Sequence, residues 1–268
     1  MRDRFRALHE AGLFVMPNPW DIGSAKVLAA IGFQALATTS SGHAGTLGRP
    51  DQQVTRDELI AHVEELAAAA GVPISVDAER CFPGDAGGVT RTAQLLADAG
   101  AAGFSIEDYD PATRTIDPLE KAVEAVAAVA AVAAQHGLVL TARAENHLYG
   151  HNDLDNTIER LIAYREAGAE VVYAPGLRDL DQIAEVVKRA EAAVNVLLLA
   201  DGPSVPELAE VGVRRVSTGG SLFRAAMGAL VRGGRVLLDE GRQAYFDDAI
   251  PTAAMTQLFS FPPRAGED

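Results

Sequence analysis

The stretch PISVDAERCFPGDAGGVTRTAQLLADAGAAGFSIED, residues 73–108, decides the fold. It begins with a short apolar run at 73–78, continues through a segment at 88–100 whose apolar residues have helical spacing, and ends with a second apolar run at 103–108. Gly100, just before the second run, is typical of the left-handed residue that ends a helix. A strand, a helix and another strand in this order predict a βαβ unit with parallel strands.

The same alternation continues along the whole chain. The expected strands are 13–17, 34–40, 73–78, 103–108, 138–143, 170–175, 195–200 and 214–219, and the expected helices are 22–31, 55–70, 88–100, 118–136, 154–167, 179–192, 205–211 and 221–235. Eight strands, each followed by a helix, predict an α/β fold, the (β/α)8 TIM barrel. A doubly wound open sheet is the alternative, but NPWDIGSA after the first strand is not its glycine-rich fingerprint.

Length and composition fit one enzyme-sized domain with a small-molecule site. The chain has 268 residues, 48% of them hydrophobic, and a formal net charge of −14. This charge repels nucleic acid and anionic membranes, so we expect neither as a partner. The single cysteine excludes an intrachain disulfide and favours a cytoplasmic location. We expect residues 1–235 to form the barrel and 236–268 to form a C-terminal helical extension whose apolar residues need a partner surface.

Polar residues gather where the predicted strands end, which is where the active sites of such barrels lie. They are Ser40, Ser41, Gly42 and His43 after the second strand, Asp77 and Glu79 after the third, Glu107 and Asp108 after the fourth, Arg143, Glu145 and Asn146 after the fifth, and Asn195 on the seventh. Converging carboxylates repel one another unless a cation lies between them. Because Mg²⁺ prefers oxygen ligands, we expect it at Asp77, Glu79 and Glu107, with Mn²⁺ also acceptable. The alternative is that some of these acids cap helix N-termini, which applies most to Asp108 and Glu145.

Three other groups are candidates for contacts with a substrate. Arg143 could grip a carboxylate or phosphonate, or it could form an ion pair with Glu145 or Glu107. His43, in SSGHAG, could be a general base or merely solvated, and the N–H and hydroxyl groups of 40–42 could hold a carboxylate. The segment STGGSLF, 217–223, is similar to a phosphate site, although its glycines could serve backbone geometry alone.

Several motifs together carry a family resemblance over nearly the whole chain. They are MPNPWDIGSAKVLAAIGFQALATTSSG (16–42), SVDAE (75–79), GFSIED (103–108), TARAEN (141–146), RLIAYREAGAEVVYAPGL (160–177) and ELAEVGVRRVSTGGSLFRAA (207–226). With these motifs the chain resembles the isocitrate lyase and phosphoenolpyruvate mutase superfamily, and more closely its phosphoenolpyruvate mutase-like branch.

The resemblance implies a barrel that exchanges its last helix with a neighbour, in a homodimer or homotetramer. It also implies Mg²⁺ near Asp77, Glu79 and Glu107, with Asp51 of GRPD close to the metal. The amides of Ser41 and Gly42 would hold the substrate carboxylate, and Arg143 would contact the substrate. The shared chemistry makes or breaks a bond next to the α-carbon of a 2-oxo acid through an enolate.

The loop DYDPATRTIDP, 108–118, departs from the family, because it lacks the cysteine, lysine or histidine that lyases and mutases carry there. Cys81 lies after the third strand and is not the family's catalytic cysteine by position. We therefore expect a Mg²⁺-dependent, lyase- or mutase-like enzyme for a small 2-oxo acid or phosphonate. Its expected catalytic residues are Arg143, Asp51 and His43, and its expected substrate-binding residues are Ser40, Ser41, Gly42, Arg143, Glu145 and Asn195. A non-catalytic metabolite-binding barrel and a phosphate-ester enzyme using Gly219 and Gly220 remain the alternatives.

Overall fold

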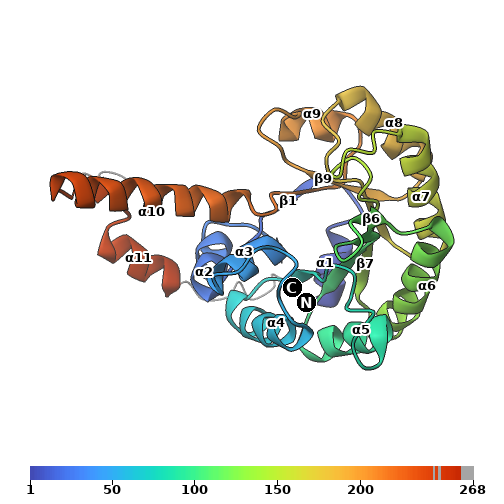
Figure 1. Cartoon of the computed structure of the whole chain (residues 1–268), viewed down its shortest axis with the longest axis horizontal. Helices are drawn as coiled ribbons and strands as arrows, with labels where there is room; N and C mark the ends of the chain where they lie inside the picture. The colour runs from blue at the N-terminus through green and yellow to red at the C-terminus, as the bar shows by residue number, and fades with distance from the viewer. Residues whose placement is uncertain (244, 247–248, 261–268) are drawn as a thin grey trace.

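A single sheet of eight parallel strands curves into a nearly closed barrel in the computed structural model, which describes residues 1–243, 245–246 and 249–260 (Figure 1). The strands are β1 (Phe14–Met16), β2 (Leu36–Ala37), β3 (Ile74–Asp77), β4 (Gly103–Glu107), β7 (Val139–Arg143), β8 (Val171–Tyr173), β9 (Ala193–Leu197) and β10 (Arg215–Ser217). Their order around the sheet is β1-β10-β9-β8-β7-β4-β3-β2. The predicted (β/α)8 barrel is confirmed.

Helices alternate with these strands and surround the sheet (Figure 1). The predicted ones are α2 (Ile22–Ala30), α4 (Arg56–Ala70), α5 (Gly88–Asp98), α6 (Leu119–His136), α7 (Leu154–Glu166), α8 (Leu180–Ala190), α9 (Val205–Glu210) and α10 (Ser221–Glu240). The elements not predicted are α1 (Arg2–Ala7), α3 (Ser40–Thr46) and the hairpin of β5 (Tyr109–Asp110) and β6 (Thr115–Ile116), whereas α11 (Thr252–Phe259) lies within the expected helical extension 236–268. The expected strand 34–40 is shorter than predicted, and α10 runs through the expected domain boundary at residue 235.

The gap between β1 and β2 is bridged although the two strands form no ladder. The amide of Ala37 donates to the carbonyl of Pro17 at 3.1 Å. The side-chain amide of Asn18 donates to the carbonyl of Thr38 at 2.7 Å. Asn18 is 5% exposed, so these bonds lie in the interior and hold the two edge strands of the sheet together.

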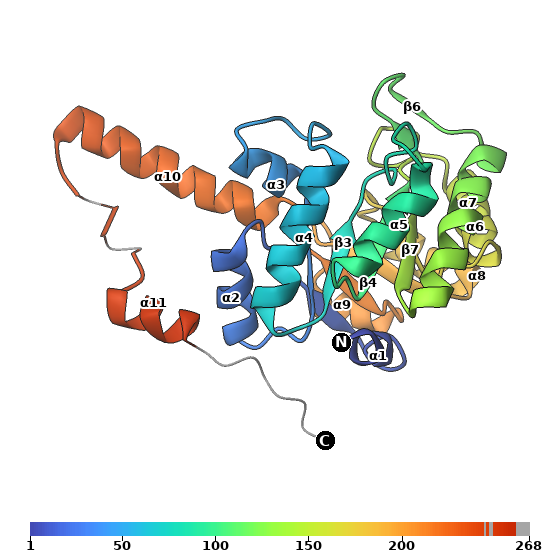
Figure 2. The same cartoon turned by 90° about the horizontal axis from the view of Figure 1, so that it is seen from below.

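Helix α1 covers the end of the barrel at which the strands begin, and α3 and the β5–β6 hairpin lie at the opposite end (Figure 2). Phe5 of α1 is fully buried in a cluster with Met16, Val139 and Val171. Arg2 adds hydrogen bonds to backbone carbonyls, including that of Ala101 at 3.1 Å. This arrangement leaves the strand C-termini as the end where a ligand site can open.

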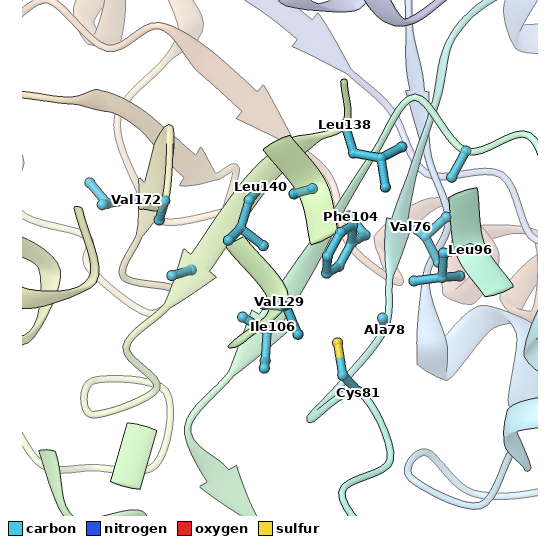
Figure 3. Close-up of a cluster of buried hydrophobic side chains, with 14 of the residues drawn as sticks. Val76, Ala78, Cys81, Leu96, Phe104, Ile106, Val129, Leu138, Leu140 and Val172 are labelled. Carbon is cyan, nitrogen blue, oxygen red and sulfur yellow. The ribbon is translucent and has the colours of Figure 1, made fainter. Parts of the chain in front are cut away.

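The main core lies between the sheet and the surrounding helices. Figure 3 shows part of it: Val76, Leu96, Phe104, Ile106, Val129, Leu138 and Leu140, all buried. Cys81 belongs to this cluster, with its side chain directed toward the core near Ala78 and Ile106 (Figure 3). Burial raises the pKa of the Cys81 thiol, so little reactive thiolate forms at neutral pH.

Helix α10 projects from the barrel, and α11 turns back beside α2 (Figures 1 and 2). The exposed apolar residues of α10 include Leu230, Leu237 and Leu238, and Leu238 is 85% exposed. That the C-terminal extension packs on a neighbouring subunit stays a prediction. Among the described residues, no helix has both the length and the apolar character needed to cross a membrane.

Candidate active site

A cavity of about 170 Å³ opens among the strand ends. The predicted site residues that line it are Ser40, Ser41, Asp51, Asp77, Arg143 and Asn195, and further polar residues on its wall are Asn18, Thr38, Ser75, Ser105, Tyr173, Arg215, Ser217, Gly219 and Gly220. The fold thus brings together residues from distant parts of the chain in one pocket.

Arg143, at the end of β7, is the centre of the charged groups. Its guanidinium contacts the carboxylates of Asp77 at 2.8 Å, Glu107 at 3.2 Å and Glu145 at 2.7 Å. It also lies over the ring of Tyr173, 5.3 Å from the ring centroid. Burial alone would lower the pKa of Arg143, but the three acids raise it well above its usual value. The ion pairs that the sequence suggested as an alternative are therefore present, and Asp77 is added to them.

The acids of the site outnumber the one arginine that contacts them. Glu79 is 9% exposed, and burial followed by the charges of Asp77 and Asp51 raises its pKa to about 8. Burial also raises the pKa of Glu107, although Arg143 opposes this. Two neighbouring carboxyls thus resist ionisation in the absence of further positive charge. A cation placed among them would restore their ordinary acidity.

The donor atoms suit a hard divalent ion. Asp77 lines the cavity and accepts the Ser40 amide at 3.0 Å on one oxygen and Arg143 on the other. No group of three or more His, Cys, Asp or Glu side chains is already arranged around a metal position within the described residues. Mg²⁺ does not require one, because it keeps several waters and is usually held by one or two carboxylates together with the substrate. Asp77, Glu79 and Glu107 offer only oxygen ligands, the type that Mg²⁺ prefers, although of the three only Asp77 lines the cavity.

Asp51 and its neighbour Gln52 connect a loop to this cluster. The Gln52 amide donates to Asp51 Oδ1 at 3.0 Å, and its side-chain amide donates to Glu107 Oε1 at 3.0 Å. Gln52 has a φ of 64°, in the left-handed region that few side chains adopt. Burial and then the charge of Asp77 raise the pKa of Asp51. Sequence reasoning identified Asp51 through the family resemblance and missed Gln52.

Ser40, Ser41 and Gly42 begin helix α3 instead of forming a loop. The Ser40 amide is used by Asp77, and the Gly42 amide donates to Thr39 Oγ1, the N-cap, at 3.3 Å. Gly42 does not line the cavity, and a Cβ there would lie 2.5 Å from the Thr39 side chain. Two of the three expected amides are thus already engaged, which leaves Ser41 as the better candidate for a substrate contact.

His43 is not where a general base for this cavity would be. It lies within α3, is 8% exposed, and does not line the cavity. Its ring stacks on that of His62, with centroids 3.8 Å apart. Burial lowers the pKa of His43. The sequence suggested a polar loop, whereas the helix turns this side chain into the packing between α3 and α4.

Glu145 and Asp108 are turned away from the cavity. Glu145 is fully buried; its carboxylate accepts from Arg143, and its amide donates to Asp108 Oδ1 at 2.9 Å. Asp108 also accepts from the hydroxyl of Tyr164 at 2.6 Å and from Arg160 at 3.1 Å. Glu145 therefore positions Arg143 and is not placed to bind substrate directly. Asp108 neither caps a helix nor lines the cavity.

The glycines of STGGSLF serve backbone geometry. The amides of Thr218 and Gly219 both donate to Asn18 Oδ1 at 2.9 Å, so the Gly219 N–H is not free for a phosphate. A Cβ on Gly220 would lie 2.5 Å from Ser41 Oγ. One of the two amides on which the phosphate-ester alternative depends is therefore already engaged. Asn18, which sequence reasoning missed, joins this turn to β1.

The loop that departs from the family forms the β5–β6 hairpin. Arg80 pairs with Asp110 at 3.0 Å and also with Asp117, at the two ends of the hairpin. The ring of Tyr109 stacks on that of Tyr149, with centroids 3.5 Å apart and planes 9° apart. The loop thus has its own ordered structure although it lacks the residues that the family uses for proton transfer.

Comparison with known proteins places the chain among enzymes. Residues 5–238 match the family model described as phosphoenolpyruvate phosphomutase. The chain is 35% identical over 238 residues to an uncharacterised protein of Mycobacterium tuberculosis, covering 88% of this chain and 89% of that one. It is 29% identical over 234 residues to 2-methylisocitrate lyase of Escherichia coli, covering 82% and 78%. A crystal structure of a Burkholderia cenocepacia protein, provisionally described as a lyase/mutase, superimposes with a TM-score of 0.92 at 45% identity, covering 97% and 96%.

Proposed function

The chain belongs to the phosphoenolpyruvate mutase family, within the superfamily that contains 2-methylisocitrate lyase, and from this premise we propose that it is a magnesium-dependent lyase or mutase-like enzyme. Its substrate is a small 2-oxo acid, and the bond made or broken is a C–C or C–P bond next to the α-carbon. The intermediate is the enolate of the 2-oxo acid. The proposal takes the enzyme to be an oligomer that acts in the cytoplasm.

The observation that carries the proposal is that Asp51, Asp77 and Arg143 line one cavity, with Glu107, outside its lining, bound to Arg143. Asp77, Glu79 and Glu107 would hold Mg²⁺, or Mn²⁺ in its place. The ion supplies a Lewis acid that stabilises negative charge on the substrate oxygens.

The protein's own groups bind and orient the substrate. Arg143 carries a charge that faces the cavity, while Glu145 fixes its position through a 2.7 Å contact. Ser41 and Asn195 also line the cavity and would supply polar contacts to the substrate. The absence of cysteine, lysine and histidine from the 108–118 hairpin argues against proton transfer of the kind that family lyases use.

Thermal unfolding with and without Mg²⁺, each in the presence and absence of oxalate, tests the proposal, because oxalate resembles the enolate of pyruvate. A ligand that binds only the folded protein raises its melting temperature. We expect a rise that requires both Mg²⁺ and oxalate and that is lost in Asp77→Asn. The control Asp98→Asn, at an exposed position on α5, should keep it.

Turnover is then measured with a panel of 2-oxo dicarboxylates and phosphonopyruvate, with product formation followed in wild type and Asp77→Asn. Turnover by wild type that is abolished in Asp77→Asn supports the proposal. No joint stabilisation by Mg²⁺ and oxalate would overturn the metal site. Joint stabilisation without turnover of any compound would instead identify a metabolite-binding barrel that does not catalyse.

A further inference from the structure

Arg215 is a second arginine in the same cavity, on β10, and nothing in the proposed chemistry uses it. It is 3% exposed. Its Nε donates to Asn195 Oδ1 at 2.8 Å and its Nη2 donates to Thr141 Oγ1 at 2.8 Å. Its Nη1 lies 3.2 Å from Nε2 of His9. Every one of these partners is neutral or, in the case of His9, held neutral.

Arg215 differs from Arg143 in having no acidic partner among the described residues. Arg143 contacts three carboxylates, whereas no salt bridge to Arg215 forms in the part of the chain that the structure describes. A buried charge without a counter-charge costs several kcal/mol even when it is hydrogen-bonded. Burial lowers the pKa of Arg215 to about 9, so the group remains cationic at neutral pH. Burial and then the charge of Arg215 lower the pKa of His9 to about 3, so His9 is uncharged at neutral pH and adds no second positive charge beside Arg215.

The position of Arg215 relative to Arg143 indicates which part of a ligand its charge could bind. Thr141, its partner on β7, precedes Arg143 by two residues on the same strand. Two residues of a strand span roughly 7 Å, so Arg215 lies about one layer of side chains below Arg143. Ser75, Ser105 and Asn195 also line the cavity. The cavity therefore has acids and Arg143 at its mouth and an unpaired cation in its floor.

We propose that Arg215 binds the second acid group of the substrate, so that the enzyme acts on small dicarboxylates and not on simple 2-oxo monoacids. This inference rests on the proposed function and specifies its substrate class. The 2-oxo acid end would lie at the mouth, near Asp77 and Arg143. The distal carboxylate would reach the floor, where it supplies the counter-charge that Arg215 lacks. The three neutral partners hold the guanidinium in place without neutralising it.

A purely structural role for Arg215 is the competing explanation, since its hydrogen bonds link β10 to β7, to β9 and, through His9, to α1. The two explanations differ in what a new carboxylate beside Arg215 would do. Asn195→Asp places one at hydrogen-bond distance with almost no change in shape. A structural arginine would be better held, and the new carboxylate in the cavity lining would weaken the binding of malonate and acetate only by repulsion, so that malonate would keep its advantage. An arginine that binds substrate would be occupied internally, and the advantage of malonate over acetate would be lost.

Thermal unfolding in EDTA, with malonate or acetate added, makes this test independent of any metal. For wild type we expect malonate to raise the melting temperature more than acetate at equal concentration and ionic strength. In Asn195→Asp we expect a higher melting temperature without ligand and no advantage of malonate over acetate. Arg215→Met should also lose this advantage. Arg214→Met is the matched control, because the neighbouring arginine donates to the carbonyl of Gly12 at the surface, and it should keep the advantage.

Two outcomes would overturn the inference: equal stabilisation of wild type by malonate and acetate, or an advantage of malonate over acetate that survives in Asn195→Asp. Because these measurements contain no divalent ion, they are separate from the test with Mg²⁺ and oxalate. Loss of the Mg²⁺-dependent response with retention of the malonate response would place the failure in the proposed metal site. The reverse pattern would leave the enzyme proposal standing and remove the dicarboxylate specificity.

Discussion

The buried hydroxyl of Tyr164 offers the clearest test of how the acid cluster is supported. Tyr164 is 1% exposed, and its hydroxyl donates to Asp108 Oδ2 at 2.6 Å. Tyr164→Phe removes this bond, together with the longer one that the hydroxyl accepts from Arg160 at 3.4 Å, and keeps the ring in the core. Asp108 would retain the amide of Glu145 and the guanidinium of Arg160 as partners.

The expected loss follows from the charge on the acceptor. A hydrogen bond to an ionised group contributes about 1.5–3 kcal/mol to the free energy of unfolding. For domains of 150–250 residues, slightly shorter than this chain, each kcal/mol corresponds to roughly 2–4 °C in melting temperature. We therefore expect Tyr164→Phe to lower the melting temperature by roughly 3–12 °C.

Urea unfolding of both proteins, followed by far-UV circular dichroism, measures the difference directly. Tyr149→Phe is the control, because its ring is 40% exposed and its hydroxyl makes no hydrogen bond within the described residues. The control should remain within about 0.5 kcal/mol of wild type. A loss below about 0.5 kcal/mol in Tyr164→Phe as well would refute the argument that Asp108 is held as a charged group.

Two further predictions concern pH and backbone geometry. Burial and then the neighbouring His43 lower the pKa of His62 to about 4, so protonation opposes folding. The stability that neutral His62 contributes is complete above its unfolded pKa, about 6.5, and is lost as the pH falls toward 4. His62→Phe should lose less stability than wild type between pH 7.5 and 5 in urea titrations, and parallel losses would contradict this. Gly220→Ala should displace Ser41 and weaken the Mg²⁺-dependent response to oxalate, whereas Gly234→Ala, with open space around it, should keep the response; equal responses would show that Ser41 is not needed there.

The fold could be predicted because its signals are local. Each strand is a short apolar run, and each helix has its own apolar spacing and a glycine or acid at its end. Helix α3 was missed because SSGHAGT has two glycines and three hydroxyl residues, all poor helix formers. Its glycines are fixed by neighbours distant in sequence: a Cβ on Gly45 would lie 2.3 Å from the ring of Phe223. Such a constraint has no local signal.

The candidate site was predictable in its location but not in its pairings. Sequence position put Asp77, Glu107 and Arg143 at neighbouring strand ends, and the structure brings them into contact. Which acids face the cavity depends on how each side chain leaves its strand, so the orientation of Asp108 and Glu145 could not be read from the sequence. His43 was misjudged for the same reason, since only the packed helices reveal His62 above it.

Arg215 did have a signal, which was overlooked. The segment VRRVS places two arginines side by side in an apolar strand. Because neighbouring residues of a strand point to opposite faces, one of the pair must point into the barrel. Arg214 takes the outer face and Arg215 the inner one. An arginine doublet in a barrel strand therefore predicts a cation in the interior.

The pairing of β1 with β10 has a consequence for the order of events during synthesis. Phe14 pairs with Arg215, and Asn18 accepts a hydrogen bond from the turn after β10. Strand β1 therefore cannot pair until residues about 200 positions later have been synthesised. Until then a nascent chain carries β1 and the growing edge of the sheet unpaired, a state prone to wrong association. Emergence of residues 215–219 from the ribosome is thus the event that allows the barrel to close, and truncated chains ending before it should depend most on chaperones.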